Sequence, residues 1–112
     1  MSALTVNLVV EKNSDFEAIF TVTDEDTGVP VNLTNYTTAS KIKKSFYSSS
    51  SVSFTTTIID AVRGKVRLTL SKDQTTALKG GRYVYDLIIT NITSNVTTRV
   101  VEGIVTVKEG VT

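Results

Sequence analysis

The stretch from residue 70 to residue 87 reads LSKDQTTALKGGRYVYDL and joins the end of one strand to a helical turn and then to a tyrosine-rich strand. The Ser71 hydroxyl is suited to accept hydrogen bonds from the free N–H groups of a first helical turn, which predicts one short helical turn near 71–79. The pair Gly80 and Gly81 predicts the end of that helix, because glycine is common just past a helix C-terminus. A short helix between strands indicates a turn that covers one end of a β-sandwich.

Alternation of apolar and polar residues on both sides of this stretch predicts further strands. The clearest case is 16–23, where Phe16, Ala18, Phe20 and Val22 fall on one face. Other strands are expected at 5–10, 36–44, 52–59, 66–70, 82–90 and 96–108. About seven to eight short strands predict an all-β fold, an Ig-like or related Greek-key β-sandwich, with residues 1–112 as a single domain. A small barrel is the alternative.

Five residues in and after the opening stretch are expected to have structural roles: Gly81, Tyr83, Tyr85, Asp86 and Gly103. Tyr83 follows a glycine pair at the start of a strand, the position of a corner tyrosine whose hydroxyl bonds back to the backbone. Asp86 lies in an apolar strand, so we expect it to satisfy a buried backbone or hydroxyl group, and its removal to cost stability.

The residue types present exclude most enzyme chemistry. The chain has no His and no Cys, which removes the common general base, the Ser-His triad and the usual zinc ligands. Asp24, Asp26 and Gly28 match only the start of a calcium-binding loop. We therefore expect no catalytic residues, no cofactor and no metal site, and a protein that is not an enzyme.

The charge balance argues against nucleic acid and membranes as partners. A net charge of +1 creates no global field that attracts either. Lys41, Lys43 and Lys44 form a small basic group near Phe46 and Tyr47, but alternation places Lys44 on the other face from the first two lysines. We interpret these lysines as protection of an exposed or edge strand.

Two loops are candidates for contacts with partner proteins. A serine run, 48–51, predicts an exposed loop tip, and 91–95 predicts the loop of the last hairpin. The candidate interaction residues are Phe46, Tyr47, Ser49, Ser50, Asn91 and Asn95. Residues 1–12 lack the basic and apolar regions of a signal peptide, and no apolar run is long enough to span a bilayer, so we expect synthesis in the cytoplasm.

Five segments form a recognisable series along the chain: an acidic turn and VNLT segment at 24–34, the basic strand KIKK at 41–44, GKVRLTL at 64–70, GRYVYDL at 81–87 and the closing strand from Glu102. Together they resemble small β-domains of bacteriophage tails and baseplates, including the N-terminal module of baseplate upper proteins and fibre-attachment domains. It implies a virion structural protein without catalytic residues. It also implies other virion proteins as partners, and a ring or trimer as a homo-oligomer in the assembled particle.

The sequence ends at Thr112 without a coiled coil or receptor-binding head, so we expect an adaptor, baseplate or decoration subunit rather than a fibre. A capsid decoration protein is a close alternative, because similar sandwiches serve on capsids. A carbohydrate-binding or adhesion module is another. Sugar sites usually contain exposed aromatic rings, and the candidates here are Tyr36, Phe46 and Tyr47 in a chain with no Trp.

Overall fold

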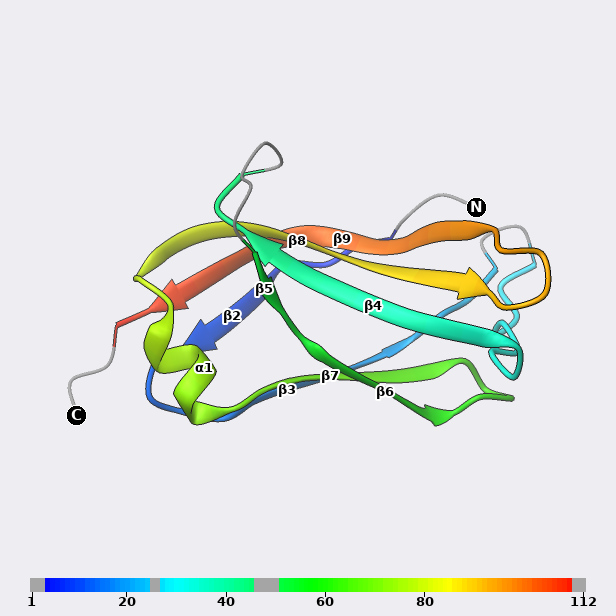
Figure 1. Cartoon of the computed structure of the whole chain (residues 1–112), viewed down its shortest axis with the longest axis horizontal. Helices are drawn as coiled ribbons and strands as arrows, with labels where there is room; N and C mark the ends of the chain where they lie inside the picture. Colours follow the sequence, from blue (N-terminus) through cyan, green and yellow to red (C-terminus); the bar gives the residue numbers. More distant parts are fainter. Residues whose placement is uncertain (1–3, 25–26, 46–50, 110–112) are drawn as a thin grey trace.

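Two packed sheets form the protein, and a computed structural model describes residues 4–24, 27–45 and 51–109 (Figure 1). Sheet A has the strand order β1-β9-β8-β4-β5, and β2 also pairs with β9. Its strands are β1 (Leu4–Thr5), β2 (Leu8–Glu11), β4 (Tyr36–Lys43), β5 (Val52–Ser53), β8 (Gly81–Asn91) and β9 (Thr97–Lys108). Sheet B has the order β3-β7-β6, with β3 (Phe16–Thr21), β6 (Thr55–Asp60) and β7 (Lys65–Leu70). The predicted all-β sandwich is confirmed; the alternative of a single closed sheet is wrong.

The core lies between the two sheets and follows the predicted alternation. In β7, Val66, Leu68 and Leu70 are buried, and in β8 Tyr85, Leu87 and Ile89 are buried. Phe54 links the two layers, because its ring centroid lies 5.8 Å from that of Phe16 and 6.1 Å from that of Tyr85. Each such side chain contributes roughly 1.5–3 kcal/mol through its removal from water.

The predicted strand at 52–59 is in fact two strands in different sheets. Residues Val52–Ser53 pair with β4 in sheet A, whereas Thr55–Asp60 pair with β7 in sheet B. The chain crosses between the sheets at Phe54, whose backbone N–H donates to the Ser40 carbonyl at 3.0 Å and whose side chain is buried. Burial of this ring between the layers accounts for the crossing.

The helix α1 (Lys72–Ala77) begins where the sequence predicts and ends earlier. Ser71 accepts from the Gln74 backbone N–H at 3.3 Å, and the Gln74 side chain accepts from the Ser71 N–H at 2.9 Å. This capping box satisfies two backbone donors at once. The prediction that Gly80 and Gly81 end the helix is wrong, because Leu78 is already extended and buries its side chain in the core.

The N-terminal strand is interrupted where it passes Gly103. Its two pieces, β1 and β2, both run parallel to β9, and the Asn7 side-chain oxygen between them accepts from the Ile104 N–H at 3.1 Å. A Cβ atom on Gly103 would lie 2.1 Å from the Val6 carbonyl oxygen, so only glycine permits this approach. The buried Tyr85 lies opposite Gly103, and its hydroxyl donates to the same carbonyl at 2.5 Å.

Candidate docking hollow on the outer face of sheet A

The outer face of sheet A contains a hollow of about 270 Å³, which we call the outer hollow. Residues of β4 and β8 that alternate with the core residues line it, and the strand pairing sets Ala39 opposite Ile88, Lys41 opposite Asp86 and Lys43 opposite Val84. The full lining is Ala39, Ser40, Lys41, Lys43, Val84, Tyr85, Asp86, Ile88 and Arg99. The hollow thus combines an apolar floor with charged groups at its sides.

A β-bulge in β9 determines the charges on one side of the outer hollow. Leu87 pairs with Val101 and Ile88 pairs with Arg99, so Val100 has no partner residue on β8. Val100 and Val101 are both buried, which returns the residues on either side of them to the outer face. Arg99 and Glu102 therefore share a face, although a regular strand would place residues three apart on opposite faces.

This bulge assembles an ion-pair network around Asp86. The Arg99 Nε lies 3.2 Å from the Asp86 Oδ2, and its Nη1 lies 3.5 Å from the Glu102 Oε2. The prediction that Asp86 satisfies a buried backbone or hydroxyl group is wrong, because its carboxylate is 30% exposed and binds a guanidinium. The buried Ser40 hydroxyl instead donates to the backbone carbonyl of Asp86.

The two lysines of the outer hollow have no acidic partner among the described residues. No carboxylate in 4–24, 27–45 or 51–109 forms an ion pair with Lys41 or Lys43. Lys44 lies elsewhere, with its Nζ 4.8 Å from the centroid of the Tyr83 ring. The predicted separation of Lys44 from the other two lysines is confirmed. The hollow therefore has a cationic side on β4 and an acidic side on β8 and β9, where two carboxylates share one guanidinium.

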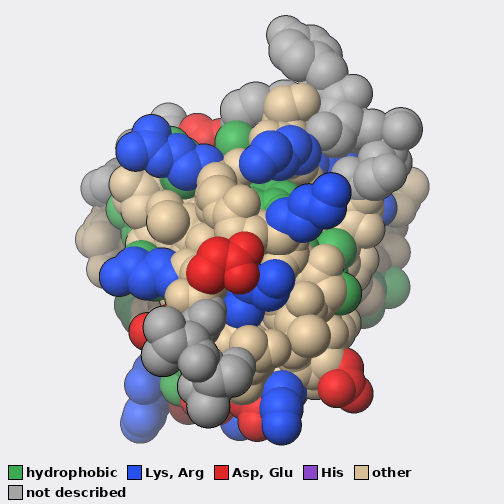
Figure 2. All heavy atoms as spheres, turned by 90° about the vertical axis from the view of Figure 1, so that its left-hand side faces the viewer, with side chains coloured by type: hydrophobic (Ala, Val, Ile, Leu, Met, Phe, Trp, Pro, Cys, Tyr) green, Lys and Arg blue, Asp and Glu red, His purple; other side chains and the backbone are tan. Residues whose placement is uncertain are grey.

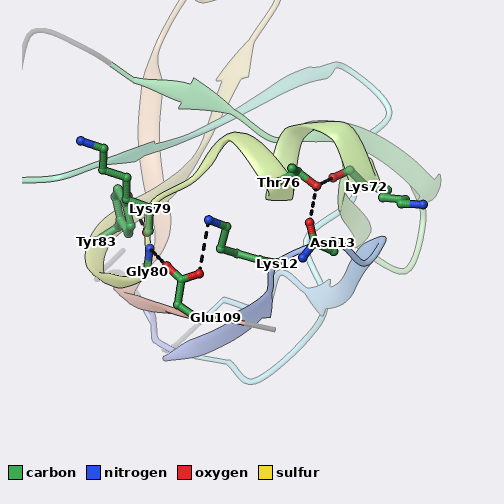
Figure 3. A network of polar contacts seen from close by, with 8 residues as sticks. All are labelled: Lys12, Asn13, Lys72, Thr76, Lys79, Gly80, Tyr83 and Glu109. Atoms are coloured by element: carbon green, nitrogen blue, oxygen red, sulfur yellow. Dashed lines mark hydrogen bonds and ion pairs between the residues drawn. The ribbon is translucent and has the colours of Figure 1, made fainter. Parts of the chain in front are cut away.

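Figure 2 shows that Lys and Arg side chains also gather at the end of the sandwich beside α1. Figure 3 shows Glu109 accepting from the Gly80 N–H at 3.0 Å and pairing with Lys12 at 3.4 Å. The Tyr83 hydroxyl donates to the Lys79 carbonyl at 2.8 Å, the back-bond expected of a corner tyrosine. Gly81 begins β8 with a φ of 136°, a conformation that favours glycine.

The candidate loop residues fall into two groups. Phe46, Tyr47, Ser49 and Ser50 lie outside the described residues. The Asn91 side-chain oxygen accepts from the backbone N–H groups of Thr93 and Ser94, at 2.9 and 3.0 Å. Asn95 has a φ of 58°, and its N–H donates to the Asn91 carbonyl at 2.8 Å. Both asparagines thus build the β8–β9 turn, and a partner contact through this loop stays a prediction.

Within 4–24, 27–45 and 51–109, no three Asp or Glu side chains gather as metal ligands. Burial raises the pKa of Tyr85 to about 12, and its hydroxyl is held by the Val6 carbonyl. Over the same residues, no helix is long and apolar enough to cross a membrane.

Among the residues that line the outer hollow, the sequence predicted structural roles for Tyr85 and Asp86 and indicated edge-strand protection for Lys41 and Lys43, but it did not group them into one site. Ala39, Val84, Ile88 and Arg99 were not among the predicted site residues. The alternation that places Val84, Asp86 and Ile88 on one face is visible in the sequence. What joins this face to Lys41 and Lys43 is the β4–β8 register, which local sequence does not encode.

In its fold, the chain is similar to the N-terminal domain of phage TP901-1 ORF48. The TM-score is 0.57 at 12% sequence identity, and the match covers 96% of this chain and 99% of that chain. A second solved structure, InlP of Listeria monocytogenes, gives a TM-score of 0.49 at 11% identity, over 95% of this chain and 28% of that chain. No protein-family model and no curated protein matches the sequence. At 12% identity the first likeness shows the fold alone.

Proposed function

We propose that the protein is a non-catalytic structural subunit of a tailed bacteriophage virion, placed in the tail or baseplate, that binds other virion proteins. The observation that carries the proposal is the fold shared with a phage protein domain over nearly the whole length of both chains. The tail-like segments of the sequence agree with it. The outer hollow supplies a surface suited to protein contact, because its apolar floor is bordered by polar and charged side chains, as an interface core is by its polar rim.

The test is to locate the protein in purified particles. Antibody against the chain, detected by gold labelling in electron microscopy, is expected to mark the tail tip. Label spread over the head would favour the capsid decoration alternative instead. Particles that carry no label, and that contain no peptide of the chain by mass spectrometry, would overturn the proposal of a virion protein.

A homo-oligomer in the assembled particle is part of this proposal. Most soluble oligomers are symmetric homo-oligomers, and the resemblance to tail and baseplate domains implies a ring or trimer. Light scattering over a concentration series measures the mass of the free protein. A stable trimer or hexamer supports assembly before docking, whereas a monomer at all concentrations restricts the oligomer to the particle surface.

The carbohydrate-binding alternative is not favoured by the outer hollow. Sugar recognition uses exposed aromatic rings as flat platforms. Tyr85 lies beneath the outer hollow, but its side chain is 2% exposed and its ring packs against Phe54 in the core. The hollow therefore presents aliphatic groups where a sugar site would present rings.

A further inference from the structure

We propose that the outer hollow binds an acidic segment of a partner protein, with a carboxylate of the partner at Lys41 and Lys43 and an aliphatic side chain on the floor. This inference rests on the proposed function, since it names the chemistry of the partner that a virion subunit would dock. The floor consists of Ala39, Val84 and Ile88, and Ile104 extends it on the neighbouring strand.

The charge argument starts from the position of Asp86. Strand pairing sets Lys41 directly opposite Asp86, so the two would be expected to form an ion pair across the sheet. Asp86 instead binds Arg99 from the other side, at 3.2 Å. Glu102 also binds Arg99, at 3.5 Å. Arg99 thereby engages both acids, and neither lysine has an acidic partner among the residues that the structure describes.

The result is an asymmetric surface that selects the sign and the orientation of its ligand. A carboxylate brought to the β4 side gains attraction from two ammonium groups. The same carboxylate brought to the β9 side meets Asp86 and Glu102, whose charges are shared with one guanidinium. Complementary charge of this kind contributes mainly to association rate and to orientation.

The size and lining of the outer hollow indicate that it accommodates one or two side chains of a partner rather than a whole small molecule. Its volume of about 270 Å³ falls below the roughly 300–1,000 Å³ of typical ligand pockets. Ala39 is exposed, while Val84 and Ile88 are half-buried, so an aliphatic side chain placed there would remove apolar surface from water. An extended acidic segment with aliphatic residues supplies both features.

Nucleic acid fits this surface less well. Binding of single strands combines a cationic groove with aromatic rings on which bases stack. The outer hollow exposes no such ring, and two carboxylates, those of Asp86 and Glu102, lie on the same face. If a nucleic-acid strand bound at the two lysines, its neighbouring phosphates would be repelled by these carboxylates.

The probe for the test is a fluorescein-labelled octapeptide of alternating glutamate and leucine, titrated at low salt and followed by fluorescence anisotropy. The double variant K41E/K43E is compared with K65E/K79E, which makes the same charge change outside the hollow at one half-buried and one exposed lysine. We expect K41E/K43E to lose at least tenfold in affinity and the control variant to stay within about twofold. Equal affinity of the two variants would overturn the proposal.

Two further probes and one further variant sharpen the outcome. An octapeptide of alternating lysine and leucine is expected not to bind, and tighter binding of a thymidine dodecamer than of the acidic peptide would replace the proposal with a nucleic-acid site.

The variant R99Q leaves Asp86 free to pair with Lys41, so it is expected to weaken peptide binding without changing either lysine. Unchanged binding by R99Q would contradict the role given to Arg99.

Incorporation into particles separates this inference from the proposed function. Tagged wild-type protein and K41E/K43E are produced in cells that assemble the virions, and each is quantified in purified particles. Loss of the variant alone supports the docking role of the outer hollow. Equal incorporation overturns that role and leaves the virion assignment intact, whereas absence of the wild type overturns the virion assignment.

Discussion

The inner and outer faces of the β8–β9 hairpin differ in what holds their side chains. On the inner face, the Tyr85 hydroxyl donates to the Val6 carbonyl, and the Val6 backbone lies too close to Gly103 for a side chain at that position. On the outer face, Asp86 and Arg99 pair across the strands in contact with solvent. Because neighbouring residues of one strand belong to opposite faces, substitutions one position apart are expected to separate stability from binding.

The largest expected effect is that of Gly103→Ala on the inner face. The added Cβ would lie 2.1 Å from the Val6 carbonyl oxygen and 2.8 Å from the Val6 carbonyl carbon. Both atoms belong to the backbone, so β1 and β2 must move away from β9. We expect a loss of about 1–3 kcal/mol in the free energy of unfolding, measured by urea denaturation.

Gly80→Ala is the matched control for this substitution. Its Cβ would also meet close neighbours, the nearest at 2.7 Å, but they belong to the flexible side chain of Glu109. That side chain has room to move at the surface, where its exposed fraction is 65%. A loss in Gly80→Ala equal to that in Gly103→Ala would show that the approach of β1 and β2 is not what requires glycine at 103.

The next effect concerns the Tyr85 hydroxyl and depends on pH. Its pKa is raised by burial to about 12 in the folded protein, against 10.0 for a free tyrosine. The native state therefore keeps this proton to higher pH than the unfolded state does, so the contribution of the neutral hydroxyl is complete below pH 10 and is lost as pH rises toward 12.

Tyr85→Phe isolates that contribution. At pH 7 the variant lacks the bond to the Val6 carbonyl and is expected to lose about 1 kcal/mol in the free energy of unfolding. Between pH 10 and pH 12 the wild type should lose stability faster than the variant, and the difference between them should shrink. Parallel stability curves over this range would contradict the raised pKa.

The same hairpin shows how far the sequence predicts the fold. Alternation in 82–90 assigns Tyr85, Leu87 and Ile89 to the core, because this signal is local. The same holds just before the hairpin, where Ser71 marks the start of α1. The bulge at Val100 leaves no comparable local signal. It arises where two valines both enter the core, and the grouping of Asp86, Arg99 and Glu102 depends on it.

Two other features depend on contacts between distant segments. The crossing at Phe54 is decided by packing against Phe16 and Tyr85, and the break between β1 and β2 by the approach to Gly103. In the sequence, both segments look like continuous strands. The lysines of the outer hollow were predicted as an exposed or edge-strand feature. That Asp86 does not pair with Lys41 follows from Arg99, which lies two strands away from β4.

A smaller effect is expected for Asp86→Asn on the outer face. The substitution removes one carboxylate from Arg99 and leaves the pair with Glu102 in place. Because the network is open to solvent, we expect a loss below about 1 kcal/mol in the free energy of unfolding. The difference from wild type should fall further when urea denaturation is repeated at high salt. A loss as large as that of Gly103→Ala would mean that the network is structural.

The smallest effect on stability is expected for the double variant Lys41→Ala and Lys43→Ala. Neither lysine forms an ion pair with a described residue, so the free energy of unfolding should stay within about 0.5 kcal/mol of wild type. Affinity for the glutamate–leucine peptide should nevertheless fall, because both attractive charges are gone. Stability that drops together with affinity would indicate that the aliphatic stems of the lysines cover the floor of the outer hollow. Stability that holds while affinity falls separates the two faces of sheet A as the alternation of its side chains predicts.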